Sequence, residues 1–205
     1  MNKAVELLIA FDEFEQKHPS SGLDDFCAYY LAQKSLPKTA IDKAQSKGQL
    51  LKMMGRLTSA FSLYHRAAMA KTSLSSSDSF YFLNGLAFLG EVKKTELINY
   101  VLVEYTTGME VISRLLKEKL ISERQDENDG RARIISLTSE GKKVLDECYA
   151  YASKAGEMIF TGMNDDSIQL CAELLRDAEQ RHSKLAVELK NKDFDEMYEV
   201  VRNHP

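Results

Sequence analysis

The chain has 205 residues, with 27 Lys and Arg against 31 Asp and Glu and a formal net charge of −4 at pH 7. This balance excludes a strongly basic protein that coats nucleic acid, while the length is sufficient for a buried core in one or two domains. Three widely spaced cysteines exclude a disulfide framework and a CxxC zinc site. Without a signal peptide or an apolar run of about 20 residues, the sequence predicts a cytoplasmic protein with no membrane attachment.

Residues 1–47 predict an N-terminal helical extension. Residues 2–17 have an amphipathic helical pattern, a break follows at 18–22, and a short helix is expected over 23–33. The polar connection 34–48 contains Pro37 and is the best candidate for a domain boundary. The extension could pack on its own protomer, swap across a dimer or bind a separate partner. We hypothesise that it enlarges a dimer interface, because its apolar faces are too small to form a core alone.

Residues 48–71 predict a long dimerisation helix. Its apolar residues alternate at spacings of four and three, which is the pattern of a heptad seam between packed helices. The seam consists of Leu50, Met54, Leu57, Phe61, Tyr64 and Ala68. A serine-rich loop over 73–78 follows, and the next helix is expected to end near Leu89, before Gly90.

Two short helices come next, at the spacing of a helix-turn-helix. The first is expected from Thr95 to about Val103, and the second from Thr106 to Glu118. Short polar side chains at the start of the second helix and longer cations further along suit a helix that reads DNA bases and holds phosphates. The exposed face would carry Thr106, Thr107, Met109, Glu110, Ser113, Arg114 and Lys117. The helix alone is equally consistent with an ordinary solvated surface.

Residues 121–138 predict a β-hairpin between two helices. Asn128, Asp129 and Gly130 favour a tight turn, and the apolar, β-branched run 134–137 favours a strand. Thr138 is expected to cap the following helix. Three cations at the tip and flanks could reach phosphates or a minor groove, namely Arg124, Arg131 and Arg133. Together, residues 72–138 therefore predict a winged helix-turn-helix, a module that usually binds duplex DNA.

The hairpin resembles that of the MarR-type winged-helix regulators. Asp129-Gly130-Arg131, followed after six residues by Leu137-Thr138-Ser139-Glu140-Gly141, is similar to that family's D-x-R and LT-x-x-G pattern. The resemblance extends over roughly residues 48–182. It implies a homodimer on a pseudo-palindromic operator in double-stranded DNA, with recognition helices in the major groove and wings at the minor groove.

The resemblance also implies roles for single residues. Asp129 would pair with an arginine and brace the wing, while Arg131 or Arg133 would reach the minor groove. Many members of the family are repressors that a small molecule, a metal or cysteine oxidation releases from DNA.

Three residues depart from the family pattern. Lys119 replaces a glycine after the recognition helix, so that turn must form by another route. Gly108 replaces an apolar core residue, which we expect to weaken the helix by roughly 0.5–1 kcal/mol. Glu110 is unfavourable near phosphates unless it accepts a hydrogen bond from cytosine or pairs with Arg114.

Residues 139–205 predict C-terminal dimerisation helices. Two sustained apolar stripes occupy residues 144–159 and 168–185, separated by a break at 162–164. The compact winged helix cannot cover both stripes, so self-association is the favoured explanation and packing against residues 50–68 is the competing one. A last short helix, with Phe194, Met197 and Tyr198, would pack on the dimer or fray.

Other kinds of site receive little support. The four histidines show no metal-binding spacing, no nucleophile elbow or phosphate loop occurs, and we predict no cofactor, no metal and no enzyme activity. The cysteines lie on apolar helix faces, where inert thiols are the default, and Cys27 is the best candidate for redox sensing. A stripe consisting of Phe61, Tyr64, His65, Met69 and Phe82 could line a cavity for a small-molecule effector, or form ordinary core.

The expected fold is therefore mainly α, with a winged helix-turn-helix and a small two-stranded wing embedded in a helical dimerisation domain. The expected function is a homodimeric DNA-binding transcriptional regulator. The alternative is a dimeric winged-helix scaffold or sensor that binds DNA weakly and acts through a protein partner, which the net charge, Glu110 and Gly108 favour. A regulator should place its arginines and lysines on one continuous face.

Overall fold

The computed structural model describes residues 2–19, 21–35, 46–127, 129–130 and 132–203. It divides into two compact units, Met1–Met53 and Met54–Pro205, and each is described by itself. The helices are α1 (Lys3–Lys17), α2 (Leu23–Ser35), α3 (Ser46–Met69), α4 (Asp78–Leu89), α5 (Lys94–Val101), α6 (Tyr105–Lys117), α7 (Ser139–Ile159), α8 (Asp165–Leu189) and α9 (Phe194–Asn203). The strands are β1 (Val92–Lys93), β2 (Ile121–Gln125) and β3 (Arg133–Leu137).

The first unit is built around the helical hairpin of α1 and α2. Aromatic rings hold the two helices together: Phe14 lies 5.6 Å from Phe26 and 5.0 Å from Tyr29, measured between ring centroids. Phe14 and Phe26 are buried, whereas Leu8 of α1 is 68% exposed. The two predicted helices of this segment are therefore present, and they enclose only a small aromatic core.

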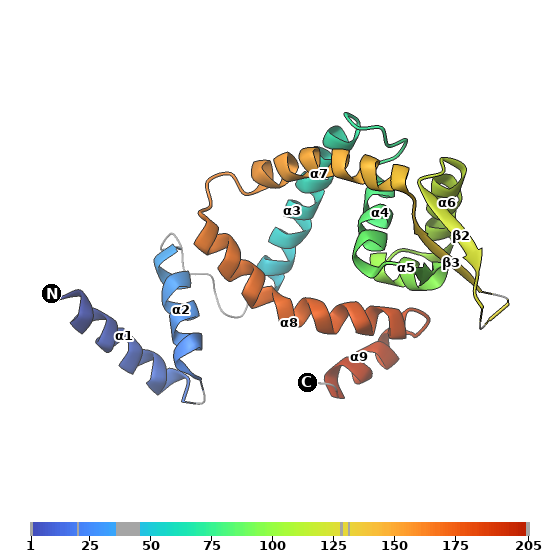
Figure 1. Ribbon diagram of the computed structural model, residues 1–205. Coiled ribbons are helices and arrows are strands. Elements are labelled where there is room, and N and C mark those ends of the chain that lie inside the picture. The colour runs from blue at the N-terminus through green and yellow to red at the C-terminus, as the bar shows by residue number, and fades with distance from the viewer. Residues whose placement is uncertain (1, 20, 36–45, 128, 131, 204–205) are drawn as a thin grey trace. The chain divides into compact units, whose positions relative to one another are not determined.

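The core of the second unit belongs to the winged helix. Helices α4, α5 and α6 pack against the sheet and the start of α7 (Figure 1). The most deeply buried aliphatic side chains are Leu83, Leu97, Ile98, Ile112, Leu115 and Ile135, each at most 1% exposed. They come from three helices and one strand, so this small core fixes α6 and the hairpin of β2 and β3 together.

The sheet has one strand more than the sequence predicted. The expected hairpin is present, with β2 antiparallel to β3 from the pair Ile121–Leu137 to the pair Gln125–Arg133. The short strand β1 adds to the other side of β3, where Val92 pairs with Ile135, giving the order β1-β3-β2. Two residues are too few to show an alternating pattern, so β1 becomes recognisable only once β3 lies beside it.

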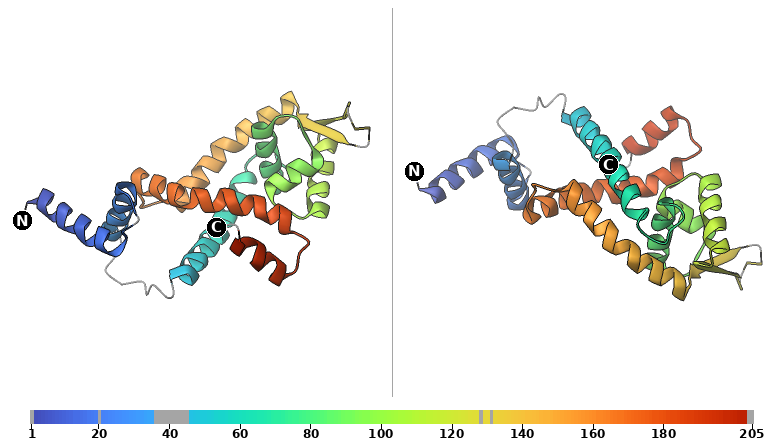
Figure 2. Two further views of the ribbon diagram at one scale, coloured as in Figure 1. Left: turned by 90° about the horizontal axis from the view of Figure 1, so that it is seen from below. Right: turned by 90° about the horizontal axis from the view of Figure 1, so that it is seen from above.

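Long helices extend from this core (Figure 1). From the end of β3, α7 runs away from α6, and α8 returns past α5 (Figures 1 and 2). Much of their apolar surface is uncovered in the single chain: Leu57 of α3 is 50% exposed and Leu174 of α8 is 59% exposed. Within the described ranges, every helix is too short or too polar to cross a bilayer.

The predicted fold class is confirmed: the protein is mainly helical and carries a winged helix with a small antiparallel sheet.

Candidate nucleic-acid interface

Helix α6 turns one face to the core and the other to solvent. Its apolar residues Val111, Ile112 and Leu115 are buried. The side chains of Thr106, Thr107, Glu110, Ser113 and Lys117 are all exposed, as the sequence predicted for a recognition helix. Short polar groups therefore lie at the start of α6 and a lysine near its end, an order that permits close approach to bases and a phosphate contact.

Two residues of the predicted reading face are placed differently from the rest. Met109 is half-buried and packs against the hydrophobic core, because its position on the helix turns it toward the domain interior. Arg114 is also half-buried, and its Nε atom is enclosed without a hydrogen-bond partner in the described part of the chain. The fully exposed part of the face is thus narrower than the sequence pattern predicted.

The wing, which we define as β2, β3 and the turn between them, lies beside α6 (Figure 1). Arg133 is exposed at the start of β3, and the side-chain amide of Gln125 donates to the carbonyl oxygen of Gly130 at 2.8 Å. The Ala132 amide donates to the Asp129 carbonyl oxygen at 2.9 Å, which closes the tip. Arg131 lies outside the described residues, and the bracing role of Asp129 stays a prediction.

Three ion pairs join β2 and the tip to the segment around β1. Arg124 contacts Glu91 at 2.8 Å, and this hydrogen bond raises the pKa of the guanidinium. Lys94 contacts Glu123 at 2.6 Å, and Lys93 contacts Asp126 at 3.4 Å. Arg124 is therefore already paired within the protein, so a phosphate would have to compete with Glu91 for it.

The turn after α6 contains Lys119 at the position where the family has glycine. Lys119 adopts a left-handed backbone conformation with φ of +60°, the conformation for which glycine is favoured at this position. Its amide donates to the Leu116 carbonyl and the Leu120 amide donates to the Leu115 carbonyl, at 3.1 and 3.0 Å. This is the hydrogen-bond pattern of a Schellman motif, so the expectation that the turn forms by another route was wrong: the helix ends in the usual way, with a strained lysine in place of glycine.

Thr138 then joins the end of α6 to the start of α7. Its hydroxyl donates toward the carbonyl oxygens of Lys119 and Leu120, at 2.8 and 3.0 Å, and accepts from the amide of Gly141 at 3.0 Å. A Cβ atom on Gly141 would lie 1.9 Å from the Leu120 carbonyl oxygen, so only glycine fits there. The threonine and glycine of the LT-x-x-G pattern thus fix the junction between the end of α6 and the start of α7.

The packing of α6 against α5 explains the glycine at position 108. It corrects the expectation that Gly108 only weakens the helix. A Cβ atom there would lie 2.5 Å from Cγ1 of Ile98 on α5. The glycine lets the two helices of the helix-turn-helix approach closely, and this packing offsets its poor helix propensity. Sequence reasoning missed this role because the contact joins residues of different helices.

The comparisons with known proteins agree with this geometry. Residues 81–141 match the family described as winged helix DNA-binding domain. This part of the chain is a winged helix domain. The sequence matches no curated protein.

Several solved structures are similar over most of their length. A MarR transcriptional regulator from Methanosarcina mazei Go1 has a TM-score of 0.60 at 22% identity, covering 72% of this chain and 96% of that one. A mutant of MarR from Escherichia coli complexed with operator DNA has a TM-score of 0.59 at 14% identity, covering 67% and 99%. Bordetella bronchiseptica BpsR, whose DNA binding is regulated by 6-hydroxynicotinic acid, has a TM-score of 0.52 at 23% identity, covering 62% and 98%. The predicted MarR-type resemblance is thus confirmed for the fold.

The residues predicted to line an effector cavity pack largely against one another and the core. His65 and Met69 of α3 and Phe82 of α4 are each at most 2% exposed, whereas Phe61 and Tyr64 are half-buried. The His65 ring stacks on Tyr81 at 4.9 Å and lies 5.1 Å from Phe80. Burial lowers the pKa of His65, partly opposed by the negative charge of Asp78.

Phe82 of this predicted set lines a cavity in the described part of the chain. That cavity has a volume of about 390 Å³ and lies between α4 and α6 of the winged helix domain, where Thr107 also borders it. Effector binding at the α3 stripe therefore stays a prediction.

The cysteines and acidic residues of the described part of the chain do not form a metal site. Among the described residues, no group of three or more His, Cys, Asp or Glu could hold a metal ion. Cys148 is buried in the core of the winged helix domain, and this burial raises the pKa of its thiol. Cys27 and Cys171 are exposed, and the redox role of Cys27 stays a prediction.

Proposed function

We propose that this protein is a homodimeric DNA-binding transcriptional regulator, a repressor that a small molecule releases from its operator. Helix α6 would enter the major groove, and the wing would lie at the adjacent minor groove of a pseudo-palindromic site. The observation that carries this proposal is the exposed polar face of α6 beside a wing with the exposed cation Arg133, in a domain matched to a DNA-binding family.

Homodimer formation is supported by the uncovered apolar surface of the long helices. Leu50 and Leu57 of α3 and Leu174 of α8 are between 45% and 59% exposed in the single chain. Such continuous apolar faces mark interfaces between proteins. Two copies joined through these helices would present two winged helix domains, as a two-fold symmetric site requires.

Small-molecule release is supported by the similarity to BpsR, whose DNA binding is regulated by 6-hydroxynicotinic acid. The structure of PcaV from Streptomyces coelicolor, which is similar to this chain, contains its natural ligand. Neither compound is assigned to this protein.

A DNA titration tests the proposal. The purified protein is titrated with its own promoter DNA and with random DNA of equal length, from low to physiological salt. We expect selective binding that weakens steeply with salt, because phosphate contacts release counterions. The Arg131→Ala, Arg133→Ala variant should bind much more weakly, whereas Arg176→Ala, which removes an exposed charge from α8, should bind like the parent protein.

The second candidate function is a winged-helix scaffold or sensor that acts through a protein partner. It is favoured by the pairing of Arg124 with Glu91 and by the exposed carboxylate of Glu110 on the reading face. Equal, weak binding to promoter and random DNA, unchanged in the wing variant, would support this function and rule out the regulator.

A further inference from the structure

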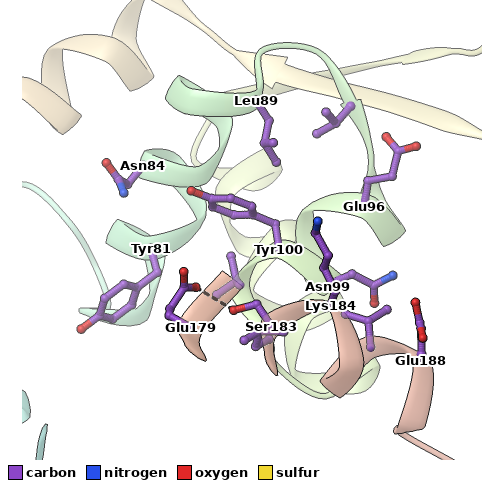
Figure 3. Close-up of a pocket in the computed structure, with 14 residues that line it drawn as sticks. Tyr81, Asn84, Leu89, Glu96, Asn99, Tyr100, Glu179, Ser183, Lys184 and Glu188 are labelled. Carbon is purple, nitrogen blue, oxygen red and sulfur yellow. Dashed lines mark hydrogen bonds between the residues drawn. The ribbon is translucent and has the colours of Figure 1, made fainter. Parts of the chain in front are cut away.

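A cavity of about 830 Å³ lies between α8 and the helices α4 and α5 (Figure 3). It is separate from the stripe on α3 that the sequence suggested for an effector, since its walls come from α4, α5, β1 and α8. Small-molecule sites in proteins commonly have volumes of about 300–1,000 Å³ and apolar walls with a few polar groups. The size and position of this cavity therefore suit a ligand of that kind.

The walls combine aromatic rings with aliphatic side chains. Tyr81 and Tyr100 line the cavity, and Figure 3 shows the Tyr100 ring across its middle, near Leu89. Both tyrosines are more than one-third exposed in the single chain, but Tyr81 stacks on His65 and Tyr100 stacks on Phe88, so each ring offers a ligand its opposite face. Leu89 and Val187 supply apolar surface on either side. An amphipathic molecule with a flat or branched body would find contacts on both walls.

The charged groups around the cavity are mainly negative. Three carboxylates line it, those of Glu96, Glu179 and Glu188, against the one ammonium group of Lys184, a formal charge of −2. One oxygen of Glu96 accepts from the Lys93 amide at 3.0 Å, and one oxygen of Glu179 accepts from the Ser183 hydroxyl at 2.6 Å. Each of these carboxylates keeps a second oxygen for a ligand. A cation would gain from this charge, whereas an anion would meet repulsion.

We propose that this cavity binds a small organic cation whose body is aromatic or alkyl. Carboxylates beside accessible tyrosine rings are the arrangement that recognises substituted ammonium groups, because the ring faces and the carboxylates both attract positive charge. The aliphatic walls would hold the apolar body of the same molecule.

The position of the cavity gives such a ligand a route to the recognition helix. Leu102 borders the cavity at the end of α5, and next to it the ammonium of Lys190, the C-cap residue of α8, donates to the Val103 carbonyl oxygen at 2.9 Å. The same ammonium lies 3.5 Å from the carboxylate of Glu104, the residue that precedes α6. A ligand that moved α8 would act on this contact. This regulatory role rests on the DNA-binding function proposed above, whereas binding of the cation does not.

Isothermal titration calorimetry of the full chain tests the site with benzyltrimethylammonium as the probe and benzoate as its anionic counterpart. We expect saturable binding of one cation per protomer and at least roughly tenfold weaker binding of benzoate. Glu188→Gln should weaken cation binding roughly threefold to tenfold, and Lys184→Met should strengthen it by a similar factor. Glu157→Gln, which removes an exposed carboxylate of α7 outside the cavity, should leave it unchanged.

The proposal is overturned if the cation does not bind, if benzoate binds equally well, or if Glu188→Gln behaves like Glu157→Gln. If a second copy of the chain covers the cavity, the cation cannot bind, and that result also overturns the proposal. The DNA titration is made on the same samples. Cation binding without DNA binding would overturn the proposed regulator and leave the site standing, and DNA binding without cation binding would do the reverse.

Discussion

Lys119 is the residue at which backbone conformation and side chain conflict most directly. A non-glycine residue at φ of +60° pays a conformational cost of roughly 1–2 kcal/mol, which the hydrogen bonds of the helix end offset here. The position accommodates the lysine side chain because that side chain is exposed to solvent.

Lys119→Gly should therefore raise the free energy of unfolding by about 0.5–1 kcal/mol, since glycine adopts this conformation without strain. Urea denaturation at a fixed protomer concentration measures the change. Lys117→Gly is the matched control: it lies within α6 and should lower stability by about 1 kcal/mol. A lower free energy of unfolding in Lys119→Gly would show that the backbone at Lys119 is not strained.

His65 gives the fold a dependence on pH. Its pKa is lowered by burial, so the unfolded chain takes up a proton on this residue more readily than the folded chain does. The contribution of neutral His65 to stability is present above its ordinary pKa of about 6.5 and is lost as pH falls from there through the lowered folded value.

We accordingly expect the urea midpoint to fall between pH 7.5 and pH 5, and to fall less in His65→Gln, which cannot gain the charge. His182→Gln is the control, because that histidine is exposed on α8. Equal pH dependence in the parent and in His65→Gln would show that another group is responsible.

At the scale of elements, Lys190 at the C-cap of α8 contacts the segment that leads into α6. Lys190 spans from α8 to the turn between α5 and α6, where it contacts both the Val103 carbonyl and the Glu104 carboxylate. Its side chain is 31% exposed and that of Glu104 is 76% exposed, so solvent screens the ion pair. The hydrogen bond to the Val103 carbonyl therefore does more than the ion pair to position the turn.

Lys190→Met should weaken promoter binding about twofold to fivefold, corresponding to the roughly 0.5–1 kcal/mol of a partly exposed contact. Lys192→Met removes the same charge two residues away, where the lysine contacts Glu196 of α9 instead. If both variants bind DNA equally, any weakening of DNA binding comes from the lost positive charge. Lys190 then does not hold the turn between α5 and α6.

The elements also show how far the sequence was informative. The order of helices, the hairpin and the cap by Thr138 follow from local patterns, and each is confirmed. The third strand β1, the half-buried position of Met109 and the close approach at Gly108 depend on contacts between segments distant in sequence. Local periodicity does not carry that information, so these features could be seen only in the folded chain.

For the candidate site the division is similar. The exposed polar residues of α6 were predicted from helical spacing, because a helix that buries Val111, Ile112 and Leu115 must expose the opposite face. The pairing of Arg124 with Glu91 was not predicted, since 33 residues separate them in the chain. The cavity beside α8 was not predicted either, because its lining residues are also far apart in the sequence.

For the whole molecule, the apolar seam of α3 is the feature that a second copy would cover. Leu57 lies on that seam and is 50% exposed, whereas Leu63 lies on the opposite side of the helix and is 60% exposed. Leu57→Glu should convert the dimer into a monomer, because a buried, unpaired carboxylate strongly disfavours an apolar interface.

Analytical ultracentrifugation measures this change, with Leu63→Glu as the control that should remain dimeric. A dimer that survives Leu57→Glu would place the interface on other helices. A chain that starts at Lys47 tests the N-terminal extension in the same way. An equally stable dimer in that chain would show that the extension does not enlarge the interface.

The position of β3 between two partners has a mechanical consequence for the wing. Ile134 and Ile135 pair with β2 on one side and with β1 on the other, while Ser136 and Leu137 pair with β2 alone. A strand hydrogen-bonded along both edges resists opening more than an edge strand does, so amide hydrogens should exchange most slowly around these two isoleucines. The second partner thus holds the wing in its outer half, one residue short of the end of β3 at Arg133, and bending on contact with a groove would be confined to the turn beyond that residue.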